Sequence, residues 1–200
     1  QGAPIAEIRE VYLRRADRGS VPVPLADKLF AAVWELGERI PSPAAPGRWL
    51  VLGTCELAEQ TAQRLADAGQ QVIRDDADAE ATDVLVVESK PPGRDSAAAE
   101  RLVMTVASTA RMLSDRASTA RLWTATTHGA AVADGEVADP GAEALRALIR
   151  VLGVEHPELT ATWVDTDSSE SLVDELLART PDALAALLAD APDAVLDANE

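Results

Sequence analysis

Short apolar runs alternate with segments of helical spacing from Arg48 onward, and this alternation limits the fold more than any other feature. Residues 49–52 form an apolar run that meets a turn at Gly53, and apolar side chains then recur at helical spacing until Gly69. Residues 84–87 are apolar at consecutive positions, as in strands that helices cover on both faces. The chain is therefore predicted to form a three-layer α/β domain around a mostly parallel sheet.

Capping residues mark the beginnings of two later helices. Asp95 or Ser96 is placed to cap a long helix, because a short polar side chain can accept hydrogen bonds from the first helical N–H groups. Asp139 followed by Pro140 predicts the start of the next helix, which we expect to end at Gly153. A strand at residues 162–165 and a helix at residues 170–178 are expected to complete the core.

Proline-rich residues 41–47 indicate a boundary, because proline removes the N–H group that the interiors of helices and sheets need. Thr180 and Pro181 are placed to begin one further helix, rich in Ala and Leu, to about residue 189. Three regions are therefore expected: an N-terminal linker with strands at residues 1–40, the α/β domain at residues 41–179, and a helix with a linker tail at residues 180–200.

Composition limits the class of protein and its partners. The chain has 200 residues, is 47% apolar and carries a net charge of −16, which opposes binding to nucleic acid or to anionic membranes. No apolar run approaches the roughly 20 residues of a membrane span. The lone Cys55 excludes an internal disulfide, so a cytoplasmic protein is expected. Trp123 and Trp163 are expected to be buried packing anchors, and the excess of arginine over lysine suggests a GC-rich, actinobacterial-like coding source.

The first turn of the domain lacks most of the glycines with which a dinucleotide fold brings its backbone close to a pyrophosphate. Gly53 is present, but the side chains of Cys55 and Leu57 would crowd the phosphates. The carboxylate of Glu56 would lie in the first helical turn, where it satisfies the helix dipole and repels a phosphate. We therefore predict a degenerate loop at Gly53 and Glu56 that holds no cofactor.

Asp75 and Asp76 leave a nucleotide site open as an alternative. They follow the second predicted strand about 22 residues after Gly53, close to where an acidic residue would bind an adenosine ribose. Residues 75–80 form an acidic run, however, which is more simply interpreted as a solvated loop. An independent nucleotide-sensing domain would require both this loop and the turn at Gly53 to bind adenine nucleotides.

Two histidines, the cysteine and a pair of serines were considered as chemical groups. His128 and His156 could serve as bases or metal ligands in principle, but they fall in different loops with no partner at ligand spacing. Cys55 at a helix N-terminus could be a reactive thiol, but no histidine can be paired with it. Ser168 and Ser169 need only cap the last core helix. Structural roles and no metal site are therefore predicted.

Residues 121–159 contain a strand, a loop, a capped helix and an acidic turn in a fixed order. The landmarks are Leu122-Trp123-Thr124, Gly129-Ala130, Glu136, Asp139-Pro140 and the Glu-His-Pro-Glu turn at residues 155–158. This order resembles the structural half of the ketoreductase domain of modular polyketide synthases, including mycocerosic-acid-synthase-like multidomain synthases. Ala147 departs from the resemblance, since the family's helix often carries a glycine there.

The resemblance implies a truncated Rossmann-like domain, similar to short-chain reductases, with the catalytic chemistry in the other half. Reductases of this kind use a tyrosine with a lysine about four residues later. The only tyrosine here is Tyr12, and Ala16 stands four residues after it. Lys28 and Lys90 have no tyrosine near them. No catalytic residues are therefore expected in this chain.

The resemblance further implies a non-catalytic scaffold domain in a multidomain polyketide or fatty-acid-type synthase, a parent chain of the acyltransferase class. Its expected partners are the neighbouring domains: the catalytic ketoreductase half, the enoylreductase and the dehydratase. The alternative is the structural half of an active NADPH-dependent ketoreductase, whose catalytic half lies further along the parent chain. NADPH and phosphopantetheine are expected elsewhere in that parent chain, with no cofactor in this segment.

Overall fold

The computed structural model describes residues 33–38, 46–74, 76, 80–88, 95–116, 118–133, 135–178, 185–187 and 194–199. The strands in these ranges are β1 (Val33–Glu38), β2 (Arg48–Leu52), β3 (Gln71–Arg74), β4 (Asp83–Val87), β5 (Arg121–Thr126), β6 (Ala161–Thr166), β7 (Ala185–Leu187) and β8 (Ala194–Asn199). The helices are α1 (Glu56–Asp67), α2 (Ser96–Asp115), α3 (Pro140–Glu155), the 3-10 helix η3 (Pro157–Leu159) and α4 (Ser169–Ala178).

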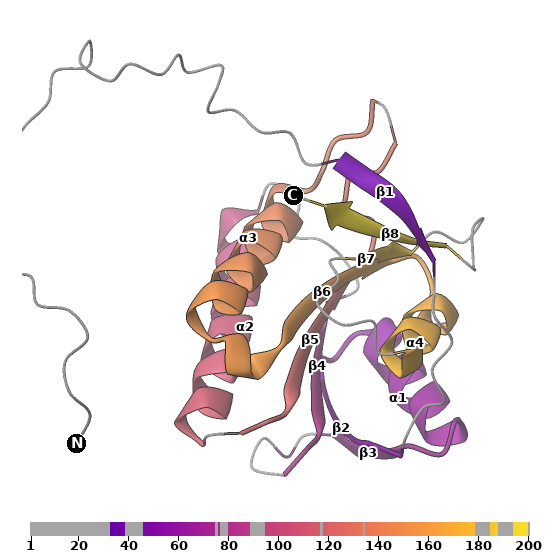
Figure 1. Cartoon of the computed structure of the whole chain (residues 1–200), viewed down its shortest axis with the longest axis vertical. Helices are drawn as coiled ribbons and strands as arrows, with labels where there is room; N and C mark the ends of the chain where they lie inside the picture. Colours follow the sequence, from indigo (N-terminus) through magenta and orange to yellow (C-terminus); the bar gives the residue numbers. More distant parts are fainter. Residues whose placement is uncertain are drawn as a thin grey trace, which may run out of the picture. The chain divides into compact units, whose positions relative to one another are not determined.

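One sheet contains all the described strands, in the order β1-β8-β7-β6-β5-β4-β2-β3 (Figure 1). The strands from β3 to β7 pair in parallel, whereas β8 runs antiparallel to both β7 and β1. The chain moves from β2 outward to β3 and then returns to β4 on the other side of β2, so the strand order reverses between β2 and β4. The predicted three-layer α/β fold with a mostly parallel sheet is confirmed.

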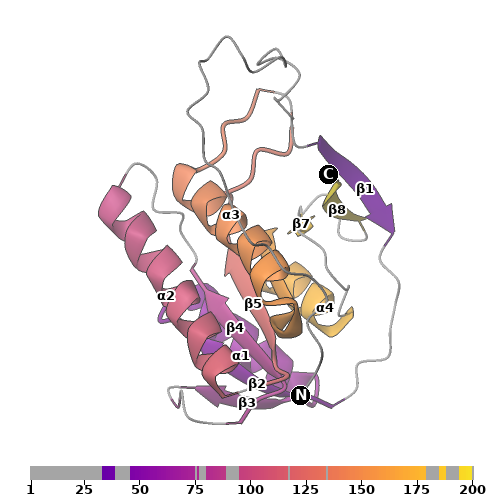
Figure 2. The ribbon, with the colours of Figure 1, turned by 60° about the vertical axis from the view of Figure 1, so that its left-hand side comes forward.

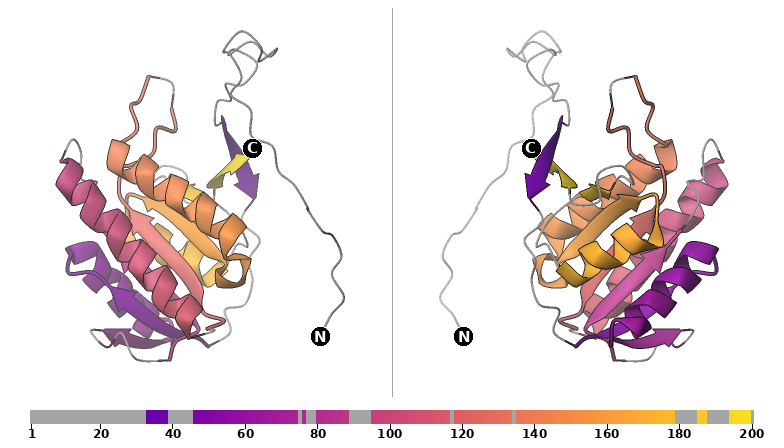
Figure 3. Two further views of the ribbon diagram at one scale, coloured as in Figure 1. Left: turned by 90° about the vertical axis from the view of Figure 1, so that its left-hand side faces the viewer. Right: turned by 90° about the vertical axis from the view of Figure 1, so that its right-hand side faces the viewer.

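Helices cover both faces of the sheet. Helices α2 and α3 lie side by side on one face (Figure 2), and α1 and α4 cover the other (Figure 3). Because successive strand residues point to opposite faces, Trp49 and Val51 join the core under α1 and α4, whereas Leu50 joins the core under α2 and α3. The continuous apolar runs of the sequence therefore supply two separate cores.

Trp123 and Trp163 are both fully buried, as predicted, and they serve opposite layers. The Trp123 ring belongs to the core under α1 and α4, and its Nε1 donates to Asp83 Oδ1 at 3.2 Å. The Trp163 ring belongs to the core under α2 and α3, and its Nε1 donates to Thr126 Oγ1 at 3.0 Å. Each indole therefore combines a large apolar contact with a satisfied N–H group.

The predicted capping residues begin their helices. Asp95 Oδ1 accepts hydrogen bonds from the N–H groups of residues 97 and 98 at 3.0 and 3.2 Å, and Asp139 Oδ1 accepts from residues 141 and 142 at 2.9 and 3.1 Å. The predicted end of α3 at Gly153 is wrong, because the helix continues to Glu155. Gly153 does not take the left-handed conformation with which a glycine ends a helix, whereas Gly69 takes it, with φ of +80°, just after α1.

A helix is predicted from Thr180 to about residue 189, but within that span the described residues 185–187 form a strand, β7, and the other residues lie outside the described ranges. This strand pairs in parallel with β6, and β8 extends the sheet toward β1. Ala and Leu favour helices locally, but an exposed strand edge offers backbone hydrogen bonds that override this preference. Strand β1 falls within the predicted linker of residues 1–40 and forms an edge of the sheet, whereas residues 1–32 lie outside the described ranges.

Candidate functional site

Parallel α/β sheets hold their ligands beyond the carboxyl ends of the strands, where the strand order reverses. In this fold that point lies between β2 and β4. A cleft of about 340 Å³ opens there between the turn after β2, the end of β4 and one side of α2. Gly53, Cys55, Glu88, Arg101 and Leu102 are among the residues that line it.

Gly53 is required by packing within the fold. Its φ is +141°, and a Cβ atom at this position would lie 2.6 Å from the carbonyl oxygen of Val87 and 3.2 Å from the Cβ of Ala58. Only glycine therefore lets the turn pass between β4 and α1. The carbonyl oxygen of Gly53 also accepts a hydrogen bond from Arg74 Nη2 at 2.6 Å. These contacts account for the glycine without a ligand.

Of the three residues expected to obstruct a phosphate after Gly53, Glu56 and Cys55 lie near the turn and Leu57 does not. Glu56 is the exposed first residue of α1, and its Oε1 accepts a hydrogen bond from Gln60 Nε2 at 2.9 Å. Cys55 precedes the helix and places its Sγ 3.8 Å from the carbonyl oxygen of Val87. The expectation that Leu57 crowds this turn is wrong, because that side chain is buried in the core under α1. The carboxylate of Glu56 thus stands at the helix N-terminus, where it was predicted.

Several predicted positions cannot be compared with the structure. Asp75, Tyr12, Lys28 and Lys90 lie outside the described residues. Asp76 is described and exposed, in the loop that follows β3. The alternative of an adenosine site at Asp75 and Asp76 therefore stays a prediction.

The two histidines lie at opposite ends of the strands, one beyond the carboxyl end of β5 and the other before the amino end of β6. His128 is exposed and follows β5, whereas His156 ends α3 shortly before β6 begins. The imidazole Nδ1 of His156 lies 3.1 Å from Glu158 Oε1, and backbone and His156 hydrogen bonds lower the pKa of Glu158. Within the described ranges, no group of three or more His, Cys, Asp and Glu side chains is placed to hold a metal ion.

The two serines before α4 play different parts. Ser168 Oγ accepts a hydrogen bond from the N–H of Ser171 at 3.2 Å, as predicted for a helix cap. Ser169 Oγ instead donates to Gln60 Oε1 at 3.2 Å and accepts from Arg64 Nε at 3.1 Å. Ser169 therefore links α4 to α1, two helices that are more than 100 residues apart in the sequence.

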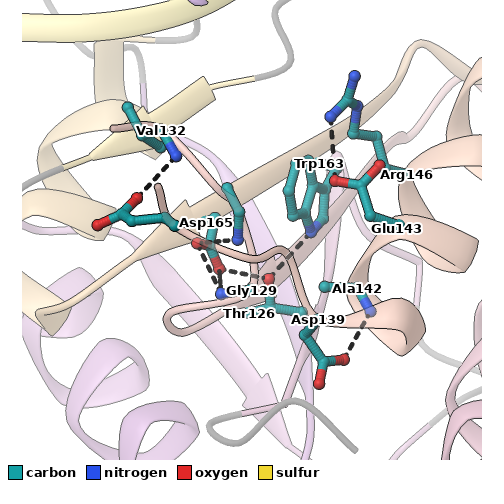
Figure 4. Close-up of polar contacts among 11 residues, drawn as sticks. Thr126, Gly129, Val132, Asp139, Ala142, Glu143, Arg146, Trp163 and Asp165 are labelled. Atoms are coloured by element: carbon teal, nitrogen blue, oxygen red, sulfur yellow. Dashed lines mark hydrogen bonds and ion pairs between the residues drawn. The ribbon is translucent and has the colours of Figure 1, made fainter. Parts of the chain in front are cut away.

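Asp165 is the main residue that sequence reasoning missed. Its buried carboxylate lies at the carboxyl end of β6 and accepts a hydrogen bond from Thr126 Oγ1 at 2.7 Å (Figure 4). The N–H of Gly129 lies 3.0 and 2.9 Å from its two oxygens, and the N–H of Ala130 donates to Oδ2 at 2.9 Å. Sequence offers no signal for this contact beyond an acidic residue in a buried strand, because the partners are 35–39 residues away.

The loop after β5 is tied to α3 as well as to β6. A Cβ atom on Gly129 would lie 2.5 Å from the Cβ of Ala142 in the first turn of α3, so this glycine allows a close approach. The N–H of Asp139 donates to the carbonyl oxygen of Gly129 at 2.8 Å. Further along, Glu136 Oε2 accepts from the N–H groups of residues 132 and 133 at 2.9 Å each. These two hydrogen bonds lower the pKa of Glu136.

No protein-family model matches the chain. Over 89% of its length the chain is 29% identical to one of the phenolphthiocerol/phthiocerol polyketide synthase proteins of Mycobacterium tuberculosis. Over 77% of its length it is 31% identical to a mycocerosic acid synthase-like polyketide synthase of the same species. The chain spans only 12% and 9% of the lengths of these two relatives. None of the described helices has the length and apolar character of a membrane span.

Solved ketoreductases share the fold. The structure of A-type ketoreductases from a modular polyketide synthase matches 84% of this chain with a TM-score of 0.60 and 23% identity. The first ketoreductase of the tylosin polyketide synthase matches the same share with a TM-score of 0.60 and 20% identity. These matches span 41% and 39% of the respective ketoreductase chains. The chain is thus a homologue of one segment of mycobacterial polyketide synthases, with the Rossmann-like fold of polyketide synthase ketoreductase domains.

Proposed function

We propose that the chain is a non-catalytic structural domain of a multidomain polyketide or fatty-acid-type synthase. It packs against the neighbouring dehydratase, enoylreductase and ketoreductase domains and keeps them within reach of a tethered acyl chain. A tether of this kind raises the effective concentration of the substrate at each site. The observation that carries the proposal is the sequence itself, in which Tyr12 is the only tyrosine and no lysine follows it at the spacing of a reductase.

The turn at Gly53 supports the same proposal. Gly53 is accounted for by its contacts with Val87 and Ala58, and Glu56 lies in the first turn of α1, where its carboxylate adds a negative charge near the helix N-terminus. A negative group at that position repels a nucleotide. NADPH and phosphopantetheine would accordingly bind elsewhere in the parent chain, which we place in the cytoplasm.

A second candidate function is the structural half of an active NADPH-dependent ketoreductase. The observation in its favour is that the chain matches only 41% and 39% of the solved ketoreductase chains, so more than half of each has no counterpart here. In that case this domain supplies stability and no reacting group, and a catalytic half further along the parent chain performs the reduction.

Deletion of residues 33–200 from the parent synthase tests the proposal and separates the two candidates. This span includes β1 and β8, so that no unpaired strand is left behind. With ketoacyl, hydroxyacyl and enoyl substrates supplied separately, a scaffold predicts slower turnover of all three, whereas a ketoreductase half predicts loss of ketoacyl turnover alone. A harmless deletion would contradict both.

A matched variant tests whether the domain has chemistry of its own. Replacing Glu56, Asp75 and His128 together by Ala removes the candidate polar groups, of which Glu56 and His128 are exposed and lie outside the two cores. Product output from the parent synthase should stay nearly unchanged. Loss of reduction by a variant that remains folded, shown by circular dichroism and thermal melting, would reveal a chemical site in this domain.

A further inference from the structure

The carboxylate of Asp165 is surrounded by hydrogen-bond donors. The N–H groups of Gly129 and Ala130 both point at it, and Thr126 Oγ1 lies 2.7 Å from Oδ1 (Figure 4). The direction of the hydroxyl hydrogen follows from Trp163, whose indole N–H can only donate and lies 3.0 Å from the same Thr126 oxygen. Thr126 therefore accepts from Trp163 and donates to Asp165. Among the described residues, the hydrogen-bond partners of this carboxylate are all donors.

The local backbone prepares these donors. His128 has φ of +54°, and the two N–H groups that follow it converge on one carboxylate. Successive N–H groups that converge in this way form an anion-binding nest. This nest is defined by the N–H groups of Gly129 and Ala130 and the hydroxyl of Thr126. It lies at the carboxyl ends of β5 and β6, two strands away from the point between β2 and β4 where the strand order reverses.

We propose that Asp165 is an internal anion that fills a preformed nest, and that removing its carboxylate leaves a binding site for small carboxylates. The inference goes beyond the proposed function and holds whether the domain is a scaffold or a ketoreductase half. Because the Asp165 carboxylate fills the nest, the nest has no room for an external anion in the unchanged chain.

The nest selects a carboxylate by its shape. Oδ1 accepts hydrogen bonds from Thr126 and Gly129, and Oδ2 accepts them from Gly129 and Ala130. The donors therefore bind both oxygens of one planar group. Asp165→Ala removes one carboxyl group, which has the size of formate. Acetate carries an additional methyl group that would compete for space with the remaining Cβ atom. Formate should therefore bind better than acetate.

Thermal melting of Asp165→Ala in sodium formate and in sodium chloride of equal ionic strength provides the test. The variant should melt below the unchanged protein in chloride, and its Tm should rise with formate concentration, because a ligand that binds only the folded state stabilises it by mass action. Acetate should raise the Tm less, and the unchanged protein should respond to neither salt beyond their general effect.

Asp95→Ala is the matched control. Asp95 also accepts two backbone N–H hydrogen bonds, but it is exposed, so that its removal opens the N–H groups to water and creates no enclosed site. Its Tm should fall without any specific recovery in formate. Equal responses of the two variants to formate would overturn the proposal. So would an Asp165→Ala protein that fails to fold in both salts.

Asp165→Asn separates the need for an anion from the need for volume. The amide fills the space, but its NH2 group would face the N–H groups of the nest, where the carboxylate oxygen accepts, and the Thr126 hydroxyl is the one group of the nest that could accept from it. This variant should be destabilised and should show no recovery in formate. The amide proton resonances of Gly129 and Ala130 should shift with formate in Asp165→Ala only. Unchanged resonances there would show that any gain in stability arises elsewhere.

Discussion

Tryptophan side chains organise the two cores at the level of single residues. Trp49, Trp123 and Trp163 are fully buried, and the rings of Trp49 and Trp123 pack with their centroids 6.3 Å apart. With only 3% aromatic residues in the chain, these rings are the largest apolar groups available to a core built from Ala, Val, Leu and Ile. Stability should therefore depend strongly on each of them.

Trp123→Ala and Trp163→Ala should each lower the free energy of unfolding by about 3–5 kcal/mol, because each leaves a large cavity in a packed layer. Against a total of about 5–15 kcal/mol, either loss leaves a marginal domain. Denaturant melts measure the change, with Met104→Ala as a control, since that side chain is largely exposed and should change stability by less than about 0.5 kcal/mol. Tryptophan losses below about 1 kcal/mol would contradict the assigned burial.

Sequence predicts some of these residues and not others. The burial of Trp123 and Trp163 follows from their places in apolar runs, which is a local property. The role of Asp165 does not, because its donors come from another strand and from the loop after that strand. Leu57 was misplaced for a related reason: the direction of a side chain on α1 depends on how the helix docks on the sheet.

Helices and strands also differ in whether nearby or distant residues determine them, and only the first kind is predicted from sequence. The helix caps at Asp95 and Asp139 are predictable, because each is a contact with residues two or three positions later. Strands β7 and β8 were not predicted, because their Ala-rich sequences become strands only through pairing with β6 and β1. The predicted end of α3 is two residues early, because it assumes that Gly153 stops the helix. Gly153 does not take the left-handed conformation of a helix stop, so the helix continues to Glu155.

Two glycine variants should change stability in opposite directions. Gly53→Ala places a Cβ atom 2.6 Å from the Val87 carbonyl oxygen at a φ of +141°, and should destabilise the domain by more than about 1 kcal/mol. Gly153→Ala adds a methyl group with no atom within 4 Å on the last turn of α3, and should stabilise by up to about 1 kcal/mol. Denaturant midpoints provide the comparison. A shift in the same direction for both variants would refute the assigned backbone geometry.

The loop after β5 should make stability depend on pH through Glu136. Hydrogen bonds from the N–H groups of residues 133 and 132 lower the pKa of this carboxyl below its ordinary value of 4.5. A lowered pKa in the folded state means that the contribution is present above the unfolded pKa and is lost as the pH falls through the folded pKa. The protein should therefore be more stable than Glu136→Gln at neutral pH, with a difference that shrinks below about pH 4.5. A difference independent of pH would argue against these hydrogen bonds.

At the scale of the whole molecule, the sheet has the strand order of nucleotide-binding folds, whereas the charge of the chain disfavours phosphate ligands. The strand order reverses at the cleft between β2 and β4, as in folds that bind nucleotides there. Glu56 places a negative charge at the neighbouring helix N-terminus, and the net charge of −16 adds to the repulsion of phosphates. The fold could be predicted from sequence, whereas the degenerate turn at Gly53 and Glu56 stays a prediction. The cleft could not, because it forms where three separate segments meet.

Calorimetric titration of the chain with NADPH and with NADH tests most directly whether this fold has kept a cofactor site. The account predicts no binding heat beyond dilution for either nucleotide, because Gly53 serves packing and Glu56 adds a negative charge in the first turn of α1. Glu56→Gln, titrated in parallel, shows whether the charge alone blocks the site. Micromolar binding of either nucleotide to the unchanged chain would contradict the account.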